Sequence, residues 1–67
     1  MQIDNITMTE IEERHAGQII DSFDAGVIYD EKSQSEVQAT DVLVWESAED
    51  AENDDGSKAV ARYLIRA

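Results

Sequence analysis

Apolar residues recur with a helical period in the first third of the chain. Met8, Ile11, His15, Ile19 and Phe23 follow one another every three or four residues. This is the spacing of one face of an amphipathic helix, and two threonines near its start each precede a glutamate by three residues, as in a capping box. The pattern predicts one helix over residues 8–23 that Gly26 ends. Gly17 disfavours a continuous helix and supports an alternative, a short helix followed by a strand over residues 18–23.

Two segments typical of β-strands follow, with polar turn residues between them. Residues 27–29 are β-prone, residues 30–35 are polar, and residues 36–46 carry apolar side chains crowded into their second half. This order predicts an antiparallel hairpin. Residues 2–6 are compatible with either a short edge strand or an irregular lead-in.

The last ten residues are compatible with two structures. Lys58, Arg62 and Arg66 are spaced by four, which makes a basic stripe on a helix whose C-terminus favours cations. The strand alternative places Ala59, Ala61, Tyr63 and Ile65 on one face. We expect the helix. The chain is therefore predicted to form a single acidic α+β domain over residues 1–67, of order (β)αββα, with helices packed on a short antiparallel sheet.

The charge of the chain narrows the classes of partner. Sixteen acidic residues stand against five basic ones, a net charge of −11. Contact with DNA, RNA or an anionic membrane relies on lysine and arginine, so we expect no direct nucleic acid and no membrane as partner, and instead the basic surface of a protein. Hydrophobic residues still make up 42% of the chain, which predicts a folded domain.

The size and composition also bear on stability and location. A chain of 67 residues forms a marginal core, which a second copy of the chain would stabilise. There is no cysteine, hence no disulfide, and the N-terminus lacks a basic start followed by an apolar stretch. These features lead us to expect a cytoplasmic protein.

Catalysis is not expected. His15 is the only histidine, and its place on the apolar stripe indicates a residue at the edge of the core rather than a ligand or a base. The serines are interpreted as turn and cap residues, since no G-x-S-x-G motif surrounds any of them. A chain this small is not expected to enclose a pocket of about 300 Å³ or more. We therefore predict a protein that is not an enzyme and has no cofactor or metal site.

Six acidic residues fall within residues 46–55. They are Glu46, Glu49, Asp50, Glu52, Asp54 and Asp55. An EF-hand loop with Gly56 at its sixth position would need an oxygen ligand at Ala51 and a glutamate at Arg62, so the segment is not an EF-hand. Two alternatives remain: a weak site for divalent cations, or a solvated helix start, capped by Ser47, that serves solubility.

The same segment also indicates a surface that imitates nucleic acid. Between Ser33 and Ser57 there are eight acidic residues and neither lysine nor arginine. B-DNA carries one charge per ~1.7 Å of axis, and acids at nearly every second residue of a helix approach that density. Such segregation exceeds what solubility needs. Trp45 and Tyr63 are candidate anchors for a partner, although a lone tryptophan on a predicted strand is more often a core residue.

A short, intensely acidic α+β domain without cysteine or proline resembles the small inhibitors that bacteriophages make against host nucleic-acid machinery. Anti-CRISPR and other DNA-mimic proteins are the groups concerned. The resemblance is carried by the six acids above together with Asp30, Glu31, Glu36 and Asp41. It implies an acidic face that docks on a basic, nucleic-acid-binding groove of a larger host protein and inhibits it. The alternative is a small homodimeric structural or assembly protein.

Overall fold

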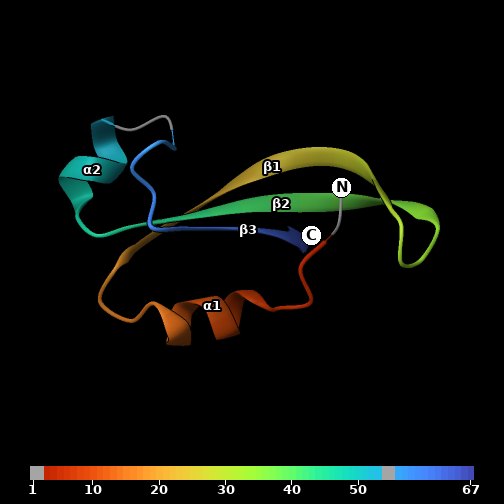
Figure 1. The fold of residues 1–67 in the computed structure, drawn as a ribbon, viewed down its shortest axis with the longest axis horizontal. Helices are drawn as coiled ribbons and strands as arrows, with labels where there is room; N and C mark the ends of the chain where they lie inside the picture. The colour runs from red at the N-terminus through yellow and green to blue at the C-terminus, as the bar shows by residue number, and fades with distance from the viewer. Residues whose placement is uncertain (1–2, 54–55) are drawn as a thin grey trace.

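The computed structural model describes residues 3–53 and 56–67. Its elements are α1 (Met8–Arg14), β1 (Ile19–Asp30), β2 (Ser35–Trp45), α2 (Ala48–Asn53) and β3 (Ala61–Arg66). The strands form one antiparallel sheet in the order β1-β2-β3, and Figure 1 shows α1 and α2 on opposite sides of it. The predicted α+β class with a small antiparallel sheet is confirmed, and the observed order is α-β-β-α-β. Within these ranges no helix is long and apolar enough to cross a membrane.

Helix α1 starts at a capping box and ends earlier than its periodicity suggests. The side chain of Thr7 accepts a hydrogen bond from the N–H of Glu10, whose carboxylate accepts one from the N–H of Thr7. His15 is the C-cap, and Gly17 has a φ of 85°, a left-handed conformation that favours glycine and ends the helix. The single helix predicted over residues 8–23 is therefore wrong, and the alternative of a short helix followed by a strand is correct.

Strands β1 and β2 form a long hairpin. Their register runs from Ile19 opposite Trp45 to Asp30 opposite Ser35. The turn at residues 31–34 confirms the predicted hairpin, although β1 is much longer than the three residues expected. Gly26 does not end a helix: it lies next to a β-bulge in β1, where its φ is 75°.

Strand β3 takes the place of the C-terminal helix predicted from the basic spacing. It pairs with residues 39–44 of β2, so the β1–β2 hairpin projects beyond it (Figure 1). Tyr63 and Ile65 lie on one face, as the strand alternative required, and both pack against the core. At the outer edge of β3, the N–H of Asp4 donates to the carbonyl of Leu64 (2.7 Å) and the carboxylate of Asp4 accepts from the N–H of Leu64 (2.9 Å). Residues 3–6 are thus a lead-in that covers this edge at one point.

The core lies between α1 and the sheet. Its buried members are Ile11, Val42, Val44 and Ile65. Ile11 is the one buried residue of α1, and the partly buried Met8 packs against the same cluster, so these two side chains hold the helix on the sheet. Because side chains alternate along a strand, Leu43 and Trp45 point to the opposite face, where α2 packs against β2.

Candidate partner-binding site

Helix α2 carries the centre of the acidic segment, and its start is encoded locally. The hydroxyl of Ser47 accepts from the N–H of Asp50 (3.3 Å), and the carbonyl of Ser47 accepts from the N–H of Ala51 (3.1 Å). Ser47 is therefore the N-cap, as predicted. Glu49 and Asp50 occupy the first turn, where the helix dipole stabilises negative charge.

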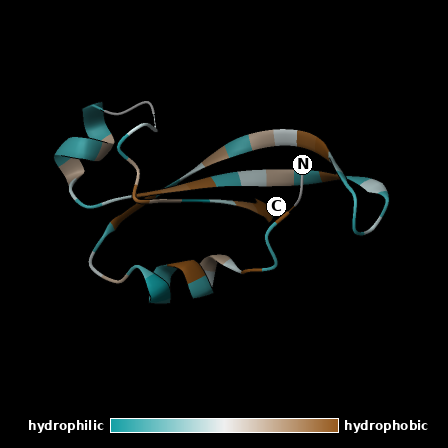
Figure 2. Cartoon of the chain, in the orientation of Figure 1, coloured by the Kyte–Doolittle hydropathy of each residue, from teal (hydrophilic) through white to brown (hydrophobic). Residues whose placement is uncertain are grey.

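None of the six residues of α2 is buried. Figure 2 shows the helix mostly in the hydrophilic colour, in contrast to the apolar stretches of the sheet. Of the predicted site residues, Glu46, Glu49 and Glu52 are exposed and Asp50 is half-buried. Asp54 and Asp55 lie outside the described residues. We call Glu46, Glu49, Asp50 and Glu52 the acidic surface.

The length of α2 sharpens the comparison with nucleic acid. Six residues at 1.5 Å each span about 9 Å, so its three acids carry one charge per ~3 Å. B-DNA has one charge per ~1.7 Å over both strands and one per ~3.4 Å along a single strand. The described helix therefore matches the charge spacing of one phosphate strand rather than that of a duplex.

Arg62 of β3 is bound by an acidic residue of the neighbouring strand β2. Two nitrogens of Arg62 donate to the carboxylate of Asp41, at 3.0 and 2.7 Å. These hydrogen bonds raise the pKa of Arg62 above its usual range. Arg66 is similarly placed 3.3 Å from Asp30. Both arginines thus offset acids of the sheet, and neither of these ion pairs involves the acidic surface.

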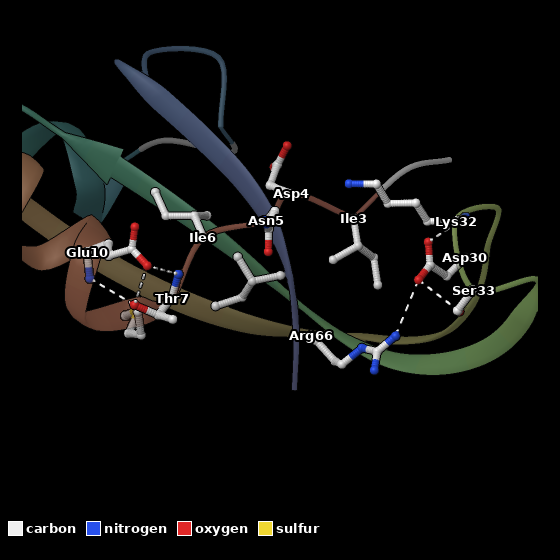
Figure 3. Close-up of a pocket in the computed structure, with 12 residues that line it drawn as sticks. Ile3, Asp4, Asn5, Ile6, Thr7, Glu10, Asp30, Lys32, Ser33 and Arg66 are labelled. Carbon is white, nitrogen blue, oxygen red and sulfur yellow. Dashed lines mark hydrogen bonds and ion pairs between the residues drawn. The ribbon is translucent and has the colours of Figure 1, made fainter.

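Asp30 lies at one end of an open cleft between the N-terminal lead-in and the hairpin turn (Figure 3). Its carboxylate accepts from the N–H of Lys32 (3.1 Å), the hydroxyl of Ser33 (3.0 Å) and the guanidinium of Arg66 (3.3 Å). The bond from Ser33 contributes most to a lowered pKa of Asp30, and burial opposes the shift. These bonds fix the hairpin turn to the end of β3.

The cleft of Figure 3 has a volume of about 720 Å³, more space than the sequence led us to expect, although it is not enclosed. Aliphatic side chains of Ile3, Ile6 and Ile65 line part of it. Every buried side-chain nitrogen and oxygen in residues 3–53 and 56–67 has a hydrogen-bond partner. The charged side chains of Asp30, Lys32 and Arg66 line another part of the cleft.

His15 stands in a chain of hydrogen bonds that the sequence did not reveal. Nδ1 lies 2.7 Å from Oε1 of Gln18, and Nε2 lies 2.7 Å from the hydroxyl of Tyr63. Since a carbonyl oxygen only accepts, Nδ1 is the donor, and in the neutral imidazole Nε2 accepts from Tyr63. Nε2 of Gln18 donates in turn to Glu46 (2.6 Å). The half-buried His15 thus links β3 to the first residue of the acidic surface.

The two aromatic candidates differ in their exposure. Trp45 is 2% exposed, so it is a core residue on the face of the sheet opposite α1 and not a surface anchor. Burying this large side chain stabilises the fold of a small domain, because its apolar surface is removed from water. Tyr63 is half-buried and bonded to His15.

Two further findings bear on the nature of the site. Within the part of the chain that the structure describes, no three histidine, cysteine, aspartate or glutamate side chains are grouped so as to hold a metal ion. No protein-family model matches the chain, and no curated protein or solved structure matches it significantly.

Proposed function

We propose that this chain is a non-catalytic inhibitor whose acidic surface binds the basic, nucleic-acid-binding surface of a larger protein. The observation that carries the proposal is that α2 presents its acids on the outside of the sheet without burying any of its own residues. The partner is a bacterial cytoplasmic protein of the kind that anti-CRISPR and other DNA-mimic proteins inhibit, an RNA-guided nuclease being the first to test.

The spacing and isolation of the charges support this partner class. A groove that binds a nucleic-acid strand places lysine and arginine to suit one phosphate charge per ~3.4 Å of helix axis, close to the charge density along α2. No lysine or arginine lies between Ser33 and Ser57, and Arg62 is held by Asp41 on the sheet. The acids therefore meet a basic partner without competition from these residues, and complementary charge accelerates the encounter.

Neutralising the acids of α2 tests the proposal without placing positive charge beside the N-terminus of the helix. In the variant Glu49→Gln/Asp50→Asn/Glu52→Gln the net charge rises by three, and the control Glu12→Gln/Glu13→Gln/Glu36→Gln changes it equally at exposed positions elsewhere. Proteins captured from a bacterial lysate at low salt and eluted at high salt supply the target. Inhibition of nucleic-acid binding by that purified target is then measured for both variants.

We expect the α2 variant to lose affinity by about tenfold or more and the control to lose far less. The affinity of the unaltered protein is expected to fall steeply above about 0.1 M salt, where exposed charges are screened. Equal losses in the two variants would mean that total charge, and not the acidic surface, determines binding. A target that keeps full nucleic-acid binding when saturated with this chain would exclude inhibition.

A further inference from the structure

Strand β1 is an open edge of the sheet, and its exposed side chains are unusually apolar. It pairs with β2 on one side, and no strand of the described residues pairs with it on the other. Five large apolar side chains are exposed in the described parts of the chain, and four of them belong to β1: Ile19, Phe23, Val27 and Tyr29. An edge strand offers N–H and C=O groups that a further strand can use. The opposite edge, by contrast, is covered at Leu64 by Asp4.

Two aspartates of β1 accept hydrogen bonds from backbone N–H groups of the same strand. The carboxylate of Asp21 accepts from the N–H of Ser22, and that of Asp24 accepts from the N–H of Gly26, both at 2.9 Å. An N–H bonded to a side chain of its own strand is not used by β2, and amides of a strand alternate between its two sides. The N–H of Ser22 therefore points to the open edge, where Asp21 blocks it.

The charge of β1 identifies what this edge accepts. Between residues 19 and 30 there are three aspartates and no basic residue, and the whole chain has a net charge of −11. A second copy would bring like charges together along the added strand, which is unfavourable, whereas lysine or arginine on an incoming segment would pair with the carboxylates. Charge complementarity thus selects an extended basic segment over a second copy.

We infer that β1 is a docking edge for an extended, basic segment of the partner protein. Lysine or arginine side chains of that segment form ion pairs with the carboxylates of Asp21 and Asp24. Because Asp21 then no longer accepts from the N–H of Ser22, that N–H is free to pair with the backbone of the segment. Ile19, Asp21 and Phe23 share one face of β1, so the aliphatic part of a lysine beside Asp21 also lies against Ile19 and Phe23. The inference rests on the proposed function, since the basic partner is the same protein.

Synthetic peptides test the edge directly. One peptide alternates lysine with valine or threonine, a second has glutamate in place of lysine, and a third is the lysine peptide N-methylated at alternate backbone nitrogens. Each is titrated into the ¹⁵N-labelled full chain. We expect the lysine peptide to shift and protect amides of residues 19–24, the glutamate peptide not to bind, and N-methylation to weaken binding by about tenfold or more, because it removes strand hydrogen bonds.

Other outcomes separate this inference from the proposed function. Shifts confined to α2 and insensitive to N-methylation would overturn the docking edge and leave the acidic surface as the binding site. No binding of the lysine peptide would also overturn the docking edge. Edge pairing at β1, combined with target inhibition that survives neutralisation of α2, would support the edge and overturn the assignment of inhibition to the acidic surface.

Variants of the two aspartates separate their charge from their blocking role. Asp21→Asn/Asp24→Asn keeps an acceptor oxygen beside each N–H but removes the charge, so we expect the lysine peptide to lose about tenfold in affinity while the chain stays monomeric. Asp21→Ala/Asp24→Ala frees the edge, so sedimentation should show concentration-dependent self-association. A monomeric alanine variant would contradict the blocking role, and a dimer of the unaltered chain with protected β1 amides would show that a second copy occupies the edge.

Discussion

The two helices of this protein are similar in length and differ in the caps and buried contacts that stabilise them. Helix α1 has seven residues, a complete capping box and one fully buried side chain, Ile11. Helix α2 has six residues, a Ser47 cap and no buried residue. Helix α1 is therefore part of the cooperative core, whereas α2 is a local structure attached to the opposite face of the sheet.

This difference shows which of the two helices depends on buried contacts with the sheet. Isolated helices of this length are not stable in water, so α1 depends on its contact with the sheet. Helix α2 buries none of its own residues, so its exposed acids are available to bind a partner and none of them is needed in the core.

Shortening the anchor of α1 should affect stability most. Ile11→Ala removes a fully buried side chain and leaves a cavity, which costs about 2–5 kcal/mol of unfolding free energy. That is a large part of the ~3–10 kcal/mol typical of a chain of this size. Urea denaturation followed by circular dichroism measures the loss, and Ile11→Val, expected to cost about 0.5–1.5 kcal/mol, gives an intermediate value if the alanine variant is unfolded. Glu52→Ala on α2 is the control and should stay within about 0.5 kcal/mol.

The hydrogen-bond chain through His15 should come next. Tyr63→Phe removes the hydroxyl that donates to Nε2 and should cost about 0.5–1.5 kcal/mol. Tyr29→Phe is a matched control, because the side chain of Tyr29 is 55% exposed. A Tyr63 variant as stable as the Tyr29 variant would show that the bond to His15 contributes nothing to the fold.

The two N-caps should differ although their chemistry is alike. Thr7→Ala removes the cap of a helix that belongs to the core and should lower global stability by about 1 kcal/mol. Ser47→Ala should lower it by less than about 0.5 kcal/mol and instead accelerate amide hydrogen exchange within α2, because this helix opens without unfolding the sheet. Equal global losses would mean that α2 is as much a part of the cooperative unit as α1.

The smallest effect is expected at acidic pH. The pKa of Asp30 is lowered in the folded chain, mainly by the hydroxyl of Ser33, so the unfolded chain takes up the proton more readily. Asp30 therefore stabilises the fold above the ordinary carboxyl pKa of about 3.9, and this contribution disappears as the pH falls through the lowered value. The melting temperature of Asp30→Asn should lie below that of the unaltered chain at pH 7 and approach it at the acid end. The control Glu36→Gln, at an exposed position, should show no comparable convergence.

The candidate site was predictable where it depended on local sequence. The Ser47 cap follows from residue type and spacing, and it places the acids of α2 where the structure has them. The pairing of Arg62 with Asp41 joins residues 21 positions apart on neighbouring strands, so no local pattern encodes it. The open edge of β1 likewise follows from the order of the strands and not from the composition of β1 itself.

By itself, the sequence determined the α+β class, the hairpin, a capping box at Thr7 or Thr9 and the concentration of acids, because each depends on neighbouring residues; the structure selects Thr7. It could not choose between helix and strand for residues 19–23 and 61–66. Their diagnostic spacing was four residues, as from Ile19 to Phe23 and from Arg62 to Arg66, and four is both close to the helical period and a multiple of the strand period. Tertiary structure decided both segments, because each pairs with β2, whose apolar residues on both faces make it the central strand.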